Sequence, residues 1–158
     1  MASDGRKDAG EKAYGARPGD SRPVQAFYEV ELSIAAKRTY VDLFERAREA
    51  EKRGDPSNKV CTTFRMVTEA IEDIIPRDPL NRSYALRDNL SNTFRLRKGR
   101  LRICWIASSV LRRVIVLFIS EFMRKAGDAN DPYRVFSKLL MSGEMDQYFL
   151  ELGVKKPR

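Results

Sequence analysis

Four arginines lie close together in the middle of the chain: Arg95, Arg97, Arg100 and Arg102. They alternate with apolar residues on both sides of Lys98-Gly99, a pattern that predicts two β-strands joined by a two-residue turn. In that hairpin, Arg97 would lie opposite Arg100 and Arg95 opposite Arg102. Because side chains alternate across a strand, all four guanidinium groups would share one face of the sheet.

The chemistry that such a face could perform is the binding of an anion. Like charges opposite one another destabilise a sheet, so a chain that keeps them is expected to bind an anionic group there. Arginine forms paired hydrogen bonds to phosphate oxygens, which makes a nucleic acid the natural candidate. The alternative is a solvated edge strand whose cations prevent aggregation, although that role does not require arginines in opposed pairs. The opposite face is apolar and is expected to pack on a core: Phe94, Leu96, Leu101 and Ile103.

The overall composition supports an anionic partner and excludes several kinds of catalysis. The 158-residue chain has a net charge of +8, and residues 89–120 contain no acidic side chain. It has no histidine, which excludes Ser-His-Asp and Cys-His catalysis and ribonucleases that use two histidines. Two isolated cysteines cannot form a zinc site, and no Gly-rich phosphate loop is present, so neither a metal nor a cofactor is expected. Arginine, lysine, carboxylate and tyrosine side chains remain as the groups that could do chemistry.

The chain is expected to be a soluble cytoplasmic protein with no membrane partner. Cys61 and Cys104 lie within apolar patterns, which predicts two buried free thiols, as is usual in a reducing cytosol. The first residues contain no apolar signal sequence. The longest purely apolar run, residues 114–119, is far too short to cross a bilayer.

The pattern along the chain predicts one domain, residues 24–152. Residues 1–23 are rich in Gly, Asp, Lys, Arg and Pro, which predicts a disordered tail, and residues 153–158 are expected to form a short C-terminal tail. Within the domain, alternation predicts strands at residues 25–32, 94–98, 100–107 and 113–119. Apolar spacing of three and four predicts helices at residues 34–53, 56–75, 132–142 and 145–152.

This order of elements predicts an α+β fold: a small antiparallel sheet with an N-terminal helical hairpin and a C-terminal helix. Ser33, Asp55 and Asp131 are the predicted N-caps of the three longer helices, and Pro76 is the predicted end of the second helix. Residues 113–119 are apolar on both faces and should form a central strand. Trp105 shares the alternation of the apolar face and is expected to pack inward.

Three side chains outside the hairpin could also take part in chemistry. Glu121 follows the predicted central strand, at a position where sheets often carry functional groups, although a plain loop carboxylate would also fit. Tyr133 follows the start of a helix and could serve either catalysis or packing. Arg124 lies in the loop between them and could reach the same anion or remain in solvent.

The segment 131–143 resembles the signature D-A-Y-x-V-F-x-K-M-L-x-x-G of the YhaV family of toxins, which belongs to the RelE-like superfamily. In this chain the segment is Asp-Pro-Tyr-Arg-Val-Phe-Ser-Lys-Leu-Leu-Met-Ser-Gly. Residues 99–102 are similar to the family's G-R-x-R strand, and Arg95 matches the arginine of the strand before it. Met123-Arg124 with Gly127 is similar to the family's L-R-x-x-G segment. The resemblance covers residues 25–150.

The resemblance implies a RelE-like fold and an RNA endonuclease that arrests translation, neutralised by a PrlF-type antitoxin. We expect cleavage of single-stranded or ribosome-bound mRNA by the neighbouring 2′-hydroxyl, without a metal. The two arginines that match G-R-x-R, Arg100 and Arg102, would stabilise the transition state. Either Glu121 or Tyr133 would be the general base. The other cations of the site would bind RNA: Arg95, Arg97, Lys98 and Arg124.

Departures from the family pattern leave other functions open. Family members carry N-D-E after the central strand, where residues 120–122 of this chain are Ser-Glu-Phe. They carry G-H-P-P after the terminal helix, where residues 143–145 are Gly-Glu-Met, so the family histidine is missing. One alternative is therefore a non-catalytic protein that binds RNA or the ribosome through the same arginines. Another places the acidic tail of an antitoxin against those arginines.

Overall fold

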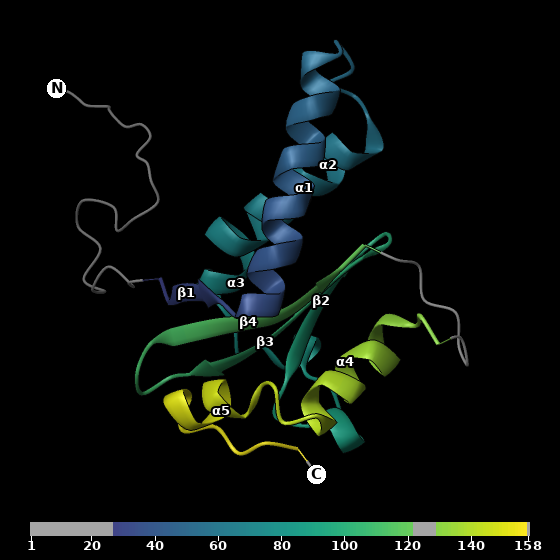
Figure 1. Cartoon of the computed structure of the whole chain (residues 1–158). Coiled ribbons are helices and arrows are strands. Elements are labelled where there is room, and N and C mark those ends of the chain that lie inside the picture. Colours follow the sequence, from purple (N-terminus) through teal and green to yellow (C-terminus); the bar gives the residue numbers. More distant parts are fainter. Residues whose placement is uncertain (1–26, 122–128, 158) are drawn as a thin grey trace, which may run out of the picture.

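A computed structural model of the chain describes residues 27–121 and 129–157 (Figure 1). The tail predicted for residues 1–23 lies outside these residues. The helices are α1 (Ile34–Lys52), α2 (Lys59–Glu69), α3 (Ile75–Arg77), α4 (Pro132–Met141) and α5 (Asp146–Leu152). The strands are β1 (Glu29–Leu32), β2 (Phe94–Lys98), β3 (Leu101–Ser108) and β4 (Arg113–Ser120). A π-helical turn, Ala70–Ile74, joins α2 to α3, and two 3₁₀ turns, Arg82–Tyr84 and Asp88–Leu90, precede β2.

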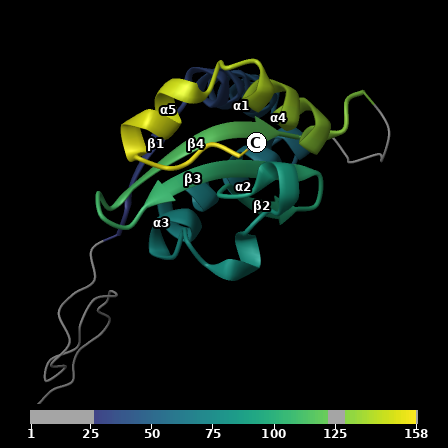
Figure 2. The same ribbon diagram turned by 90° about the horizontal axis from the view of Figure 1, so that it is seen from below.

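The strands form one sheet in the order β1-β4-β3-β2, with helices on both faces. The helices α1, α2 and α3 cover one face, and α4 and α5 cover the other (Figures 1 and 2). The predicted α+β class is confirmed. The strands β2, β3 and β4 are antiparallel neighbours, whereas β1 runs parallel to β4, with Val30 opposite Val114. The sheet is therefore mixed, because the long connection from β1 to β4 permits a parallel pairing that a short turn would forbid.

The central strands β3 and β4 are buried on both faces, as the apolar run in β4 predicts. On the side of the helical hairpin, Leu43 of α1 belongs to the core cluster that contains Trp105. On the other side, Leu117 of β4 belongs to the core cluster that contains Phe136 of α4. Trp105 is fully buried, as predicted, and its Nε1 donates a hydrogen bond of 2.9 Å to the carbonyl oxygen of Pro79. Both cysteines are free and buried, also as predicted.

The β2–β3 hairpin differs in register from the one predicted. Its two-residue turn begins at Gly99 rather than at Lys98, so Arg97 lies opposite Arg102 instead of Arg100. The predicted arginine pairs are therefore wrong. The reason is the backbone of Gly99, which has φ +55° and occupies the first central position of the turn, where glycine avoids a steric cost. As a result, Arg100 lies in the turn and only three of the four arginines share a face of the sheet.

The second helix of the hairpin begins later than predicted. Its N-cap is Asn58, whose side chain accepts a hydrogen bond of 2.9 Å from the backbone N–H of Val60. The predicted cap, Asp55, lies in the preceding turn and accepts a hydrogen bond of 3.1 Å from the Asn58 side chain. The side-chain oxygen of Asn58 reaches the first unpaired N–H groups of α2, whereas Asp55 lies too far from them to cap the helix. At the other end, α3 stops at Arg77, close to the stop predicted at Pro76.

The residues after α5 contact the domain. The Asn92 side chain donates a hydrogen bond of 2.9 Å to the carbonyl oxygen of Lys155. Lys156 forms an ion pair of 2.7 Å with Asp146, and Val154 packs against the core beneath α5. Residues 153–157 therefore follow the surface of the fold in the part of the chain that the structure describes.

Ser33 ties the first helix to the central strand. It is fully buried, and its Oγ accepts a hydrogen bond of 3.0 Å from the backbone N–H of Ala36, which makes it the predicted N-cap of α1. The same hydroxyl donates a hydrogen bond of 2.8 Å to the carbonyl oxygen of Leu117 in β4. One side chain therefore satisfies a donor at the start of α1 and an acceptor just beyond the part of β4 that pairs with β1.

We predict that Ser33→Ala lowers the free energy of unfolding by about 1–3 kcal/mol, because it leaves a helix N–H and a buried carbonyl without partners. Urea denaturation followed by circular dichroism measures this change. The exposed Ser57 is the control, and Ser57→Ala should change stability by less than about 0.5 kcal/mol. Equal effects of the two substitutions would show that the buried hydroxyl contributes nothing specific.

Candidate functional site

Three arginines lie on the α4 side of the sheet, and we call them the arginine face: Arg95, Arg97 and Arg102. Arg95 lies opposite Cys104, not opposite Arg102 as predicted. In the described part of the chain, none of the three forms an ion pair with a carboxylate. The four apolar side chains predicted for the other face belong to the core on the side of the helical hairpin: Phe94, Leu96, Leu101 and Ile103. The face therefore concentrates positive charge without a neutralising side chain.

Arg102 is held rigidly at the base of the hairpin turn. Only 6% of its surface is exposed. Its Nη1 donates hydrogen bonds to the carbonyl oxygens of Gly99, at 2.6 Å, and Leu101, at 3.0 Å. Its Nε is buried and has no hydrogen-bond partner among residues 27–121 and 129–157, and the same is true of the Nε of Arg95. Buried donors without partners are uncommon in proteins, and these two mark positive charge that the described residues do not neutralise.

The first turn of α4 brings Tyr133 to the arginine face. The guanidinium carbon of Arg95 lies 6.0 Å from the centre of the Tyr133 ring, within the range of a cation–π contact. Tyr133 is half-buried, so its ring helps to fix the arginine. The structure thus places Tyr133, Arg95, Arg97 and Arg102 on the same side of the sheet, although they are distant in sequence.

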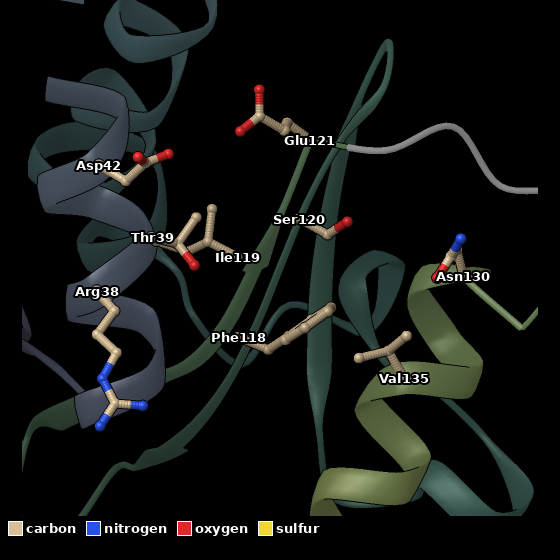
Figure 3. A pocket seen from close by; sticks show the side chains of 9 residues that line it. All are labelled: Arg38, Thr39, Asp42, Phe118, Ile119, Ser120, Glu121, Asn130 and Val135. Atoms are coloured by element: carbon tan, nitrogen blue, oxygen red, sulfur yellow. The ribbon is translucent and has the colours of Figure 1, made fainter. Parts of the chain in front are cut away.

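A groove of about 530 Å³ between α1 and α4 continues the site across β4 (Figure 3). Phe118 and Ser120 line it from the strand, and both point toward α4. Ser120 lies opposite Arg102 in the sheet, and Phe118 stacks on Phe136 with ring centres 5.6 Å apart. Asn130, just before α4, adds an amide to the wall. The groove offers both apolar and hydrogen-bonding surface beside the arginine face.

A β-bulge explains why the sequence did not reveal this part of the site. Val116 pairs with Trp105 and Phe118 pairs with Cys104, so Leu117 is an extra residue in β4. Strict alternation would place Phe118 on the same face as Val116, toward the helical hairpin. The bulge turns Phe118 and Ser120 to the arginine face instead. No residue type in the apolar run marks the bulge.

Glu121 does not join the arginine face. Its carboxylate binds both terminal nitrogens of Arg46 on α1, with one contact at 3.4 Å and the other shorter. The hydrogen bond from Glu121 raises the pKa of Arg46, and Asp42 supports the same arginine at 2.9 Å. The two candidates for the general base, Glu121 and Tyr133, are therefore held by different partners, Arg46 and Arg95.

Two predicted site residues do not join the arginine face: Lys98, predicted to bind RNA, and Arg100, predicted to stabilise the transition state. Lys98 and Arg100 line a groove between the β2–β3 turn and the helical hairpin, which we call the hairpin groove. Its other charged residues are Arg46, Lys59 and Glu121. The remaining predicted contact, Arg124, lies outside the residues that the structure describes.

Cys104 lies beneath the arginine face. Burial raises the pKa of its thiol from 9.0 to about 12, and the nearby charges of Arg95 and Arg102 offset this effect only in part. The thiol therefore remains neutral at physiological pH and supplies no negative charge to the two arginines.

We predict that this thiol makes the protein less stable in alkali. Above about pH 9 the unfolded chain releases the thiol proton while the folded chain keeps it, so stability falls as pH rises, by about 1.4 kcal/mol per unit up to about pH 12. Urea denaturation at several pH values measures the difference between the wild type and Cys104→Ala. Other titrating groups are common to both proteins and cancel. A difference that stays constant between pH 8 and pH 11 would contradict the assignment.

Neither a metal centre nor a membrane span is evident where the structure describes the chain. Within residues 27–121 and 129–157, no three histidine, cysteine or carboxylate side chains form a group that could hold a metal ion. No helix in these ranges is long and apolar enough to cross a membrane.

Comparison with known proteins identifies the class. The model of the YhaV toxin family, described as toxins with endonuclease activity of toxin–antitoxin systems, matches residues 28–155. The chain belongs to this family. It is thus a toxin with endonuclease activity, and an antitoxin is its partner. The predicted family is confirmed.

Other comparisons are more distant. The toxin–antitoxin complex RelBE2 of Mycobacterium tuberculosis contains a chain similar to this one, with a TM-score of 0.44 and 22% sequence identity. The similarity covers 60% of this chain and 98% of that chain. No curated protein matches the sequence.

Proposed function

We propose that this toxin is a metal-independent endoribonuclease that cuts single-stranded or ribosome-bound mRNA in the cytoplasm and so inhibits translation. The observation that supports it best is the arginine face itself, whose three guanidinium groups form no ion pair with a carboxylate of the described residues and of which Arg95 lies against the Tyr133 ring. Guanidinium groups fit phosphate oxygens, and arginines remain charged throughout a reaction. An RNA phosphate at the arginine face would supply the negative charge that these arginines lack.

The proposed reaction uses the RNA itself as nucleophile. The 2′-hydroxyl loses its proton to solvent and attacks the adjacent phosphorus, and the bond from phosphorus to the 5′-oxygen of the next nucleotide breaks. The products are a 2′,3′-cyclic phosphate and a free 5′-hydroxyl. The protein has to hold the strand in line, neutralise the charge that builds up on the phosphorane and protonate the leaving oxygen.

The geometry suggests a role for each side chain of the site. Arg95 and Arg102 neutralise the phosphorane, and the exposed Arg97 binds a neighbouring phosphate. Tyr133, which we expected as a possible general base, is assigned instead the role of proton donor to the leaving 5′-oxygen. Glu121, which we expected as a possible base, is engaged by Arg46 and is not assigned a proton-transfer step. Arg100 is assigned to RNA binding rather than to the transition state, because it lies in the turn and lines the hairpin groove.

The proposed partner that silences this activity is an antitoxin of the PrlF type. An acidic segment of that partner could neutralise the arginine face directly, since both RNA and a carboxylate-rich tail would use the same guanidinium groups. RNA binding and antitoxin binding at this face would then be mutually exclusive.

We predict that Arg95→Ala slows cleavage about 10²–10³-fold, by analogy with the loss of one oxyanion donor. The assay follows a labelled mRNA, with and without ribosomes, in EDTA, and identifies 2′,3′-cyclic phosphate ends. Arg95 is a better probe than Arg102, which also holds the turn. Arg48→Ala, on an exposed position of α1, is the control and should cleave at the wild-type rate. RNA that stays intact with wild-type protein but binds in a salt-sensitive manner would identify a non-catalytic RNA-binding protein instead.

We predict that Tyr133→Phe slows cleavage about 10²–10⁴-fold, because the variant keeps the ring under Arg95 and loses only the hydroxyl that protonates the leaving group. A substrate with sulfur in place of the 5′-bridging oxygen needs no such proton. Wild type and variant should therefore cut this substrate at similar rates. A variant that is equally slow on both substrates would show that the hydroxyl acts in some other step.

A further inference from the structure

The hairpin groove is a second positively charged surface, separate from the arginine face. It lies between the start of α2 and the tip of the β2–β3 hairpin, on the opposite side of the sheet from Tyr133, and has a volume of about 420 Å³. This volume is within the range of about 300–1,000 Å³ that is usual for ligand sites.

The cations of this groove are poorly neutralised. Glu121, its carboxylate, is already bound by Arg46. Lys98 approaches Glu69 only at 3.6 Å, between partly exposed side chains. Neither Lys59 nor Arg100 forms an ion pair or hydrogen bond through its side chain with the described part of the chain. The groove therefore carries an excess of positive charge that is available to a ligand.

The uncharged lining suits a nucleotide better than a simple ion. Thr62 and Thr63 of α2 contribute hydroxyl groups to the wall. Val60, Met66 and Leu101 contribute apolar surface. A single RNA strand presents phosphates to cations and base faces to apolar or aromatic surfaces, and grooves that bind it combine the two kinds of lining.

The cations of the two surfaces form a continuous row along the hairpin. Arg97 faces α4, Lys98 faces the helical hairpin, and Arg100 lies at the tip between them. Because a strand rises about 3.3 Å per residue, Arg95 and Arg97 are spaced by about 6.6 Å along one face, and the row continues past the turn. A strand bound at the arginine face can thus continue over the tip.

We propose that the hairpin groove is a second RNA-binding site, which holds the phosphates of the strand beyond the cleavage point. This inference rests on the proposed function, because it assumes that the arginine face binds the scissile phosphate. The groove lengthens the RNA footprint and favours long substrates over short ones. An acidic protein segment lacks the bases that the apolar lining accommodates, and so fits the groove less well.

The test measures binding without cleavage. The probes are 2′-O-methyl oligonucleotides of three and twelve nucleotides, which lack the attacking hydroxyl, and binding is followed by fluorescence anisotropy across a range of salt concentrations. Each phosphate contact contributes about 0.7 to the slope of log affinity against log salt for single strands. The double variant Lys59→Ala/Arg100→Ala should lower this slope by about 1.4 for the twelve-nucleotide probe and leave the three-nucleotide probe unchanged.

The control is the double variant Arg48→Ala/Lys52→Ala, which also removes two positive charges, but from exposed positions on α1. It should bind both probes like the wild type. An unchanged slope for Lys59→Ala/Arg100→Ala on the long probe would overturn the proposal. If that double variant also lost binding to a polyglutamate peptide, the groove would belong to an acidic protein segment instead.

Failure of the proposed function gives a different result. In that case wild-type protein does not cut unmodified RNA, and this result does not depend on how the affinity for the 2′-O-methyl probes changes with salt. The groove can therefore be tested even if the chain proves to be a non-catalytic binder, since the 2′-O-methyl probes report only contact.

Discussion

The burial of β3 and β4 on both faces is the constraint on which the rest of this structure depends. Apolar side chains point alternately into two separate core clusters, one beneath the helical hairpin and one beneath α4 and α5. The two layers of helices therefore fix the register of the sheet, because a slip of one residue would exchange the two sets of side chains. They also fix which polar residues of the hairpin emerge beside α4.

The arginine face is held at an energetic cost that the fold offsets locally. A buried cation without a counter-charge loses hydration, and replacement contacts have to compensate for it. For Arg102 the replacement is a pair of backbone carbonyls at the hairpin turn, and for Arg95 it is the ring of Tyr133. Neither arrangement uses a carboxylate. Our proposal assigns this positive charge to an RNA phosphate, in agreement with the endonuclease activity of the family.

The hairpin separates two kinds of cation that the sequence presents as one group. Its α4 side carries the buried Arg102, the half-buried Arg95 next to Tyr133, and the exposed Arg97. Its other side carries exposed or half-exposed lysine and arginine around the hairpin groove. The ion pair between Glu121 and Arg46 lies on this second side and links the end of β4 to α1. A carboxylate that lies close to the arginines in sequence is therefore directed away from them in space.

The sequence by itself determined the family, the α+β class, the buried Trp105 and the presence of an arginine-rich hairpin, because alternation, helix caps and a local motif are read along the chain. The tertiary structure alone decided that Gly99 starts the turn, that Arg100 leaves the arginine face and that Ser120 and Phe118 join it. It also decided that Tyr133 lies beside Arg95 and that Glu121 is bound by Arg46 instead. A turn shifted by one residue and a bulge at Leu117 each change which side chains share a face. Local composition does not single out either change, because glycine suits more than one position of a two-residue turn and no residue type in the apolar run marks a bulge. The packing of the strands between two layers of helices selects one arrangement from those that the sequence allows.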